Sequence, residues 1–388
     1  MTIGKPRRAV TAVFFINGLT LSTYIVRAPS FKSELRLTDA GFGLVGMLFA
    51  VAALAAMQLV GPLVARAGSR AVLRATLTVM PLLLAAVAAA PGRWWFALTA
   101  TALGAAHGTT DAAMNAHAVT VERLAGRPIL SGCHAAWSVS AVVASLTAAA
   151  LTHAGVALSV HLVVAASVLL VAGLLVTPHL LPASAEVAPR EGPTPRARAP
   201  WSAPLLLLGL TGTALMVCEG AALGWGGIFL HDARGATLTV AATAVTAYTA
   251  GQTAGRLVGD RLTLRVGAQP LFRTGAALAT AGFAAAVLTR HPYAAVAGFA
   301  LAGLGTSVLL PLTFSAIGNL PGAATATLVS RFTTFTYAGI LLGPALIGWT
   351  AQLAGLGPTL TALIPLLAAM AILPRPSVRR PEPAAVPQ

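Results

Sequence analysis

The sequence predicts an all-α integral membrane protein whose twelve transmembrane helices form two pseudo-symmetric six-helix bundles. Of its 388 residues, 57% are hydrophobic and only 9% are charged, whereas about a quarter of the residues of a soluble domain are charged. Apolar stretches of about 20 residues, the length that crosses a bilayer as a helix, recur between turn residues or charges. One long connection rich in proline and arginine lies near the midpoint of the chain. This composition argues against a soluble enzyme.

The first six expected helices lie between the N-terminus and this connection. Three basic residues, Lys5, Arg7 and Arg8, precede an apolar run that is long enough to span the bilayer, which favours a first membrane helix over a cleavable signal peptide. Tight turns at Pro91-Gly92 and at residues 153–155 separate later helices. The six expected spans are residues 9–29, 40–64, 72–90, 94–119, 128–151 and 156–177.

The second six expected helices follow the connection, with tight turns at Arg290-His291 and at residues 353–357. Their expected spans are residues 204–230, 238–260, 271–289, 292–316, 324–350 and 357–373. The predicted organisation is therefore an N-terminal six-helix bundle (1–177), a cytoplasmic linker (178–203), a C-terminal six-helix bundle (204–374) and a cytoplasmic tail (375–388).

The distribution of basic residues predicts the orientation, because cytoplasmic loops of membrane proteins are enriched in lysine and arginine. Seventeen of the 25 lysines and arginines fall on the side of the N-terminus, and five fall on the opposite side. We therefore expect a multi-pass protein of the cell membrane with both termini in the cytoplasm. The net charge of +15 then records orientation and does not require a nucleic-acid partner.

An internal repeat supports two related halves. Residues 66–74 (RAGSRAVLR) can be laid over residues 265–273 (RVGAQPLFR) at an offset of 199, and the same offset relates Ser131 to Ser330. Two matches at one offset predict duplicated halves related by an axis along the membrane normal.

These loops resemble the signature of the major facilitator superfamily, and the resemblance covers essentially the whole chain. The first half carries Gly61, Arg66, Gly68 and Arg70 with Ala65 at the acidic position, and the second carries Gly255, Asp260, Arg261, Arg265 and Gly267. The resemblance implies a cytoplasmic latch that holds the halves together in the outward-open state. Its expected residues are Arg66, Gly68, Arg70, Arg256, Asp260 and Arg261. In a local alternative, Asp260 only pairs with Arg256 one turn earlier.

Two further stretches look like the fucose-permease-like branch of sugar:proton symporters and its uncharacterised relatives. They are residues 14–38 and Asp111-Ala112-Ala113-Met114-Asn115 in the fourth span. The resemblance places Asp111 at the proton-coupling carboxylate of that helix. Where that branch has its other carboxylate, this sequence has Ile25. The resemblance therefore does not imply proton coupling through a pair of carboxylates.

Asp111 and Glu219 are the two acids deep inside expected spans. A charge at the centre of a bilayer is costly, so such a carboxylate is a candidate proton carrier. His107, Asp111 and Asn115 recur every four residues and share one helix face. They form either a proton relay (His107, Asp111) with a solute ligand (Asn115) or a stripe that only hydrogen-bonds to neighbouring helices.

Glu219 has three possible roles: a second proton carrier, a solute ligand beside the glycine-rich residues 224–227, or an ion pair with Arg331 or Arg27. Arg331 can instead extend to the cytoplasmic surface. Further polar and aromatic side chains in the spans predict a moderately polar central site, although each one alone is more often a packing residue. The candidate solute-binding residues are Asn17, Tyr24, Arg27, Asn115, His134, Trp137, Trp225, Tyr248, Gln252 and Arg331.

No P-loop or metal-ligand spacing occurs, and Cys133 and Cys218 stand singly in apolar runs, so we expect no cofactor, metal or disulfide. The predicted function is that of a monomeric secondary transporter, not an enzyme, which moves a small polar solute with protons as its halves rock in the bilayer. Proton-driven efflux of a drug or secondary metabolite is the alternative. Efflux members of the superfamily usually carry an arginine inside helix 4 and a Gly-Pro motif in helix 5, and neither occurs here. A receptor or scaffold without transport is a third possibility.

Overall fold

A computed structural model describes residues 3–37, 39–185, 201–320 and 324–372 of the chain. The described part is helical almost throughout and contains no strand. Residues 186–200 and 373–388 lie outside it, and with them most of the predicted linker and all of the predicted tail.

The N-terminal half contains the six expected long helices and one short addition. The first span ends earlier than expected because the backbone leaves the helix at Arg27, and a second helix with Pro29 in its first turn follows; proline is tolerated there but not in a helix interior. The helices are α1 (Gly4–Val26), α2 (Ala28–Glu34), α3 (Asp39–Ala67), α4 (Ser69–Ala88), α5 (Arg93–Ala125), α6 (Leu130–His153) and α7 (Leu158–Val176).

The C-terminal half also follows the expected spans, but three of these are divided. The seventh span begins as α8 (Ala203–Gly220) and widens into π-helical turns at η3 (Ala221–Trp225) and η4 (Phe229–Ala233), with α9 (Gly226–Ile228) between them. The glycine-rich residues 224–227 lie in this segment, and π-helical turns recur at functional sites. The other helices are α10 (Leu238–Val266), α11 (Ala268–Leu288), α12 (Pro292–Thr306), α13 (Leu309–Gly318), α14 (Thr325–Ala354), α15 (Leu356–Thr361) and α16 (Leu363–Ile372).

Nine helical segments of the described chain are long and apolar enough to cross a membrane, and a shorter apolar segment covers residues 356–372. The two remaining spans, α5 and α10, are 33 and 29 residues long but are less apolar than the others. α5 carries the His107, Asp111 and Asn115 stripe, and α10 carries Gln252, Arg256 and Asp260, which accounts for their lower hydropathy. Twelve spans are thereby accounted for, and the protein is a multi-pass membrane protein.

The internal repeat is visible in the backbone of two loops. Gly68, between α3 and α4, has φ 77° and ψ 153°, and Gly267, between α10 and α11, has φ 85° and ψ 160°. Both turns need a positive φ, which glycine adopts without a steric penalty. The two loops are 199 residues apart, so the predicted offset relates segments of the same structure.

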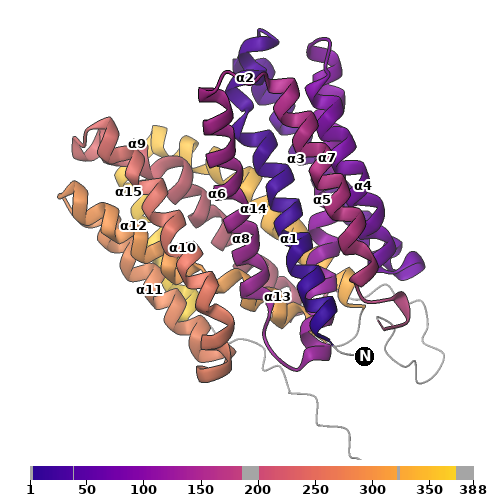
Figure 1. Ribbon diagram of the computed structural model, residues 1–388. Helices are drawn as coiled ribbons and strands as arrows, with labels where there is room; N and C mark the ends of the chain where they lie inside the picture. The colour runs from indigo at the N-terminus through magenta and orange to yellow at the C-terminus, as the bar shows by residue number, and fades with distance from the viewer. Residues whose placement is uncertain (1–2, 38, 186–200, 321–323, 373–388) are drawn as a thin grey trace, which may run out of the picture.

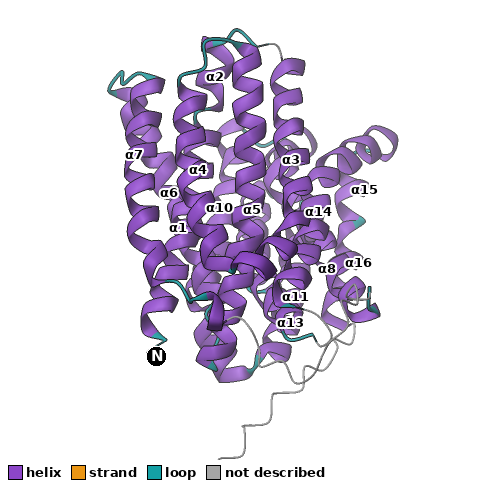
Figure 2. Ribbon diagram, turned by 90° about the vertical axis from the view of Figure 1, so that its right-hand side faces the viewer, coloured by secondary structure: helices purple, strands orange, loops and turns teal. Residues whose placement is uncertain are grey.

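The two halves lie side by side and have separate hydrophobic cores. Figure 1 shows the N-terminal half, coloured indigo to magenta, on the right and most of the C-terminal half, coloured rose through orange to yellow, on the left. One core belongs to the N-terminal half with additions from α8, α13 and α14, and the other lies within residues 215–370. The long helices run roughly parallel from the end at which α1 begins to the opposite end (Figure 2). We call the end at which α1 begins the N-terminal face.

The first residues of the predicted linker are packed against the N-terminal half. Two short turns, η1 (Thr177–His179) and η2 (Ala183–Ala185), follow α7, and Leu180 and Leu181 between them are buried. The Leu181 N–H donates to His117 Nε2 at 3.3 Å. Burial of this leucine pair explains why residues 178–185 are held against the bundle.

Candidate functional site

The predicted stripe on α5 lies where the two halves meet. His107 is buried, and its Nδ1 is 3.1 Å from Asn17 Oδ1 on α1. Its Nε2 is 2.9 Å from the hydroxyl oxygen of Tyr337 on α14. A neutral imidazole satisfies both contacts if Nδ1–H donates to Asn17 and Nε2 accepts from Tyr337. His107 therefore links the N-terminal half to the C-terminal half.

Asp111 and Asn115 extend this stripe towards the N-terminal face. Asp111 is half-buried and lies within electrostatic reach of Tyr337. Asn115 is buried, and its Nδ2 donates to the backbone oxygen of Asp111 at 2.9 Å. Its side-chain oxygen has no hydrogen-bond partner. The stripe thus combines a carboxylate with an unsatisfied amide at the boundary between the halves.

A second polar cluster joins α6, α8 and α10. Arg256 on α10 is buried, and its Nη1 donates to Ser138 Oγ on α6 at 2.7 Å. Glu219 on α8 and His134 on α6 both interact electrostatically with Arg256. Glu219 therefore has a cationic neighbour in Arg256, which was not among its expected partners.

A third cluster lies at the N-terminal face, where two carboxylates share the first turn of α6. Glu122 on α5 accepts from the N–H groups of Ile129 (2.8 Å) and Leu130 (3.2 Å). Asp260 on α10 accepts from the next two, Ser131 (3.0 Å) and Gly132 (2.9 Å). The first N–H groups of a helix have no partner inside it and favour negative charge. One of these carboxylates belongs to each half, so Asp260 connects the halves here.

Asp260 and Arg256 thus have different hydrogen-bond partners, one on the α6 backbone and the other at Ser138. Of the remaining expected latch residues, Arg66 and Arg261 are exposed, Arg70 is half-buried, and Gly68 forms the turn described above. Their side chains do not contribute to the hydrogen bonds that Asp260 makes with α6.

Other hydrogen bonds between the halves lie at or near the same face. The Glu122 carboxylate accepts from Ser315 of α13, and the Arg123 Nη1 donates to Thr325 Oγ1 at 2.9 Å. Between α3 and α14, Gln58 Nε2 donates to Thr334 Oγ1 at 2.5 Å, and Ser330 Oγ donates to the Met57 carbonyl. The halves are therefore joined at the N-terminal face.

At the N-terminal face, the contact between α3 and α14 differs from the contact between α6 and α10. The first-half motif has the exposed Ala65 where the signature has an acid. Close packing joins the helices on this side, because a Cβ at the buried Gly61 would lie 3.3 Å from Thr327 Cα on α14. The α3–α14 contact therefore has no counterpart of the Asp260 carboxylate.

Some predicted solute residues lie beside the polar clusters. The ring of His134 lies between Phe14 and Phe314, with centroids 5.2 and 5.8 Å away, and its Nε2 has no partner. Trp137 packs against Gly18 of α1. Gln252 is buried one turn from Arg256, and its Nε2 also lacks a partner.

Other predicted solute residues contact their own half. Tyr24 stacks on Phe49 with ring centroids 5.8 Å apart, and Arg27 donates to Thr152 of α6. The Tyr248 hydroxyl lies 2.8 Å from Thr306 Oγ1, and Trp225 packs against Gly348. The Arg331 guanidinium lies over the Trp201 ring, 4.6 Å from its centroid. Phe49 in turn lies 6.0 Å from the His107 ring, so Tyr24 approaches the α5 stripe through it. Tyr248 is within electrostatic reach of Glu219 and Arg256 and thus lies beside the second polar cluster.

The sequence analysis did not single out Tyr337, Ser138, Ser315 or Glu122 as functional residues. Tyr337 could have been found, because it is one of four tyrosines and lies in the middle of the eleventh expected span. The serines carry no such signal, since single hydroxyls are common in membrane helices and bond to the backbone of their own helix.

Comparisons with known proteins agree with this architecture. The sequence profile of the Major Facilitator Superfamily matches residues 10–235 and 210–388. An uncharacterised MFS-type transporter of Yersinia pestis is 31% identical over 346 residues, 88% of each chain. The membrane protein MosC of Rhizobium meliloti is 30% identical over 363 residues, 92% of this chain and 86% of that protein.

Among solved structures, the fucose:proton symporter FucP of E. coli superposes with a TM-score of 0.76 at 16% identity, covering 96% of this chain and 98% of that one. A crystal structure of FucP in the outward conformation gives a TM-score of 0.78 at the same identity and coverage. The similarity to these structures establishes the fold, and the profile match and the two similar sequences establish the family. The chain belongs to the major facilitator superfamily.

Proposed function

We propose that this transporter moves a small polar solute, such as a sugar, across the cell membrane together with protons. The observation that carries the proposal is the hydrogen bond between His107 and Tyr337, which crosses the boundary between the halves one helix turn from Asp111. A titratable carboxylate beside a contact that must break when the halves rock is the arrangement that coupling requires. The structural likeness to a fucose:proton symporter agrees with this assignment.

In the proposed orientation both termini lie in the cytoplasm, and the N-terminal face is the cytoplasmic face. The hydrogen bonds of Glu122, Arg123 and Asp260 then close the transporter on the inside, which corresponds to an outward-facing state. The excess of basic residues on this side supports the orientation.

Asp111 is the proposed coupling group. A carboxylate anion is expensive to enclose in a low-dielectric interior, so the halves can move past Asp111 more readily after it has taken up a proton. His107 and Tyr337 would sense the change, since both take part in the contact between the halves. Proton uptake on one side and release on the other then drive accumulation of the solute.

The proposed solute site lies between the α5 stripe and the Arg256 cluster. Buried polar atoms without partners are costly, and solute hydroxyls or carbonyls can satisfy them. Such atoms occur on both halves: Asn17 Nδ2, Asn115 Oδ1 and His134 Nε2 on one, and Gln252 Nε2 and Arg256 Nε on the other. Glu219, near Arg256, would accept from a solute hydroxyl or carry a second proton.

Asp260 is the proposed latch of the outward-facing state. Its carboxylate holds the first turn of α6 across the boundary, so opening of the cytoplasmic face must break both hydrogen bonds. The half-buried Asp260 and the exposed Arg261 stand in the superfamily signature, whereas the first half lacks the acid.

The test replaces Asp111 with asparagine and measures transport in proteoliposomes. Asp111→Asn is expected to abolish gradient-driven accumulation while solute exchange persists, because the amide cannot titrate. Asp232→Asn removes an exposed acid in η4 at the opposite end and serves as the control. Undiminished accumulation by Asp111→Asn would reject the assignment. Solute export driven by an inward proton gradient would favour efflux, and the absence of any flux would favour a receptor.

A further inference from the structure

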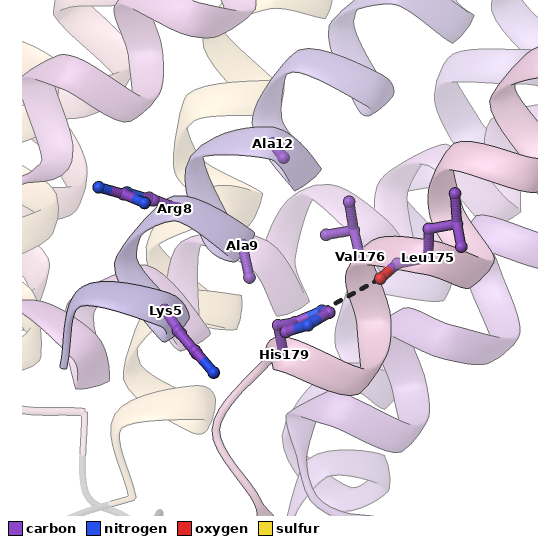
Figure 3. Close-up of a pocket in the computed structure, with 7 residues that line it drawn as sticks. All are labelled: Lys5, Arg8, Ala9, Ala12, Leu175, Val176 and His179. Carbon is purple, nitrogen blue, oxygen red and sulfur yellow. Dashed lines mark hydrogen bonds between the residues drawn. The ribbon is translucent and has the colours of Figure 1, made fainter. Parts of the chain in front are cut away.

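Two pockets flank the first turns of α1 at the N-terminal face. The larger, of about 560 Å³, lies between α1, α6 and the loop that joins α5 to α6, and we call it the α1–α6 pocket. The smaller, of about 370 Å³, lies between α1 and the end of α7 (Figure 3). Arg8 and Ala12 line both pockets. Figure 3 shows that the Arg8 side chain extends away from His179, which lies across the smaller pocket.

The walls of the α1–α6 pocket change from basic to apolar in one direction. Along α1 the lining residues are Arg7 and Arg8, then Thr11, and then Phe15. From Arg8 to Phe15 the helix rises about 10 Å. On the other wall Arg127 precedes α6, and Ala136 lies in its second turn. Both walls therefore pass from positive charge at the membrane face to apolar surface deeper in the bilayer.

The pocket has positive charge that the protein leaves available. Three guanidinium groups line it, and no acid is among the lining residues. The two acids at the first turn of α6 are already engaged, because Asp260 and Glu122 accept from its first N–H groups. Arg7 is within electrostatic reach of Asp260, whereas Arg8 and Arg127 are exposed.

We propose that the α1–α6 pocket binds an anionic phospholipid of the bilayer. The arginines bind the phosphate, for which guanidinium geometry is well suited, and an acyl chain lies against Phe15 and Ala136. Basic pockets between membrane helices on the cytoplasmic side take anionic head groups, and a cationic head group such as choline is repelled by three arginines. This inference concerns the lipid annulus and holds whether or not the protein carries protons.

Native mass spectrometry of the purified, delipidated full chain tests the proposal by titration with dioleoyl phosphatidylglycerol or dioleoyl phosphatidylcholine. The wild type is expected to retain phosphatidylglycerol in preference to phosphatidylcholine. Arg8→Gln is expected to weaken phosphatidylglycerol binding about fivefold, and a variant that also carries Arg7→Gln and Arg127→Gln about a hundredfold. Arg273→Gln, an exposed arginine at the start of α11 in the other half, is the matched control.

A second variant separates the two parts of the ligand. Ala136→Phe fills the apolar wall without changing the charge, so it should weaken phosphatidylglycerol binding while the three arginines still attract an anionic head group. Inorganic phosphate is titrated in parallel, with thermal stability as the readout. Equal losses for Arg8→Gln and Arg273→Gln would overturn the proposal. Stabilisation by inorganic phosphate equal to that by phosphatidylglycerol, with Ala136→Phe without effect, would overturn it in favour of a site for free phosphate.

Discussion

Replacement of Asp260 with alanine should open the N-terminal face. The substitution removes two hydrogen bonds, 3.0 and 2.9 Å long, from a carboxylate to the N–H groups of Ser131 and Gly132. A hydrogen bond to a charged group is worth about 1.5 to 3 kcal/mol, and water at the membrane face replaces part of it when the halves separate. We therefore expect a loss of about 2 to 3 kcal/mol from the closed state. This corresponds to an equilibrium shift of about 30- to 150-fold, since about 1.4 kcal/mol is a factor of ten.

The shift can be measured as thiol accessibility at the first turn of α6. The Ser131 side chain is buried beside Gly259 of the other half, while its latch contact uses only the backbone. Ser131→Cys, with Cys133 and Cys218 changed to alanine, therefore reports opening as a faster reaction with a water-soluble thiol reagent. Asp260→Ala should accelerate this reaction, and Asp260→Asn, which keeps one acceptor oxygen, should have a smaller effect.

Asp232→Asn is the control for this experiment, because it removes an exposed carboxylate far from α6. Its reaction rate should equal that of the background protein. Equal rates for Asp260→Ala and Asp232→Asn would refute the reasoning, since the α6 contact would then contribute nothing to closure.

Three other substitutions test separate parts of the structure. Tyr337→Phe removes the 2.9 Å contact with His107 and should favour separation of the halves about fivefold in the same accessibility assay, because a neutral hydrogen bond contributes about 1 kcal/mol. Glu219→Gln removes the carboxylate that interacts with the buried guanidinium of Arg256, so it should change the transport KM or its pH dependence. If both stay the same, Glu219 has a structural role. Gly108→Ala should lower the free energy of unfolding by about 1 to 3 kcal/mol, and with it the melting temperature, because its Cβ would lie 2.7 Å from a backbone atom of α3. Gly46→Ala, with open space around it, should raise the melting temperature, and equal shifts for the two glycines would contradict the packing argument.

The fold was predictable because the bilayer constrains each helix separately. A span must be apolar and about 20 residues long, and both properties can be read along the chain without knowledge of its neighbours. The same reasoning singled out Asp111 inside the fourth span, which is α5, whereas it placed Asp260 at the end of the eighth span, which continues in α10 to Val266. The offset of 199 also predicted the matching turns at Gly68 and Gly267.

Contacts between helices were harder to predict, because they depend on how the halves meet. Asp260 was expected to belong to a latch, but no side-chain type in the sequence indicates that its carboxylate accepts from the backbone N–H groups of α6. His107 was expected to be either a relay or a packing residue, and its partner Tyr337 lies 230 positions away. Arg27 was a reasonable solute ligand by charge, yet it contacts Thr152 within its own half.

The difference between the two latch motifs follows from the physics of their contacts. On the α6–α10 side, a carboxylate holds helix N–H groups, and this attraction is sensitive to protonation and to nearby cations such as Arg7. On the α3–α14 side, Gly61 allows close packing against Thr327, which depends on shape and is indifferent to charge. A change in the charge of Asp260 therefore acts on the α6–α10 side and leaves the packing of Gly61 against Thr327 unaffected. The halves would then begin to separate between α6 and α10, while the packed α3–α14 contact serves as the pivot.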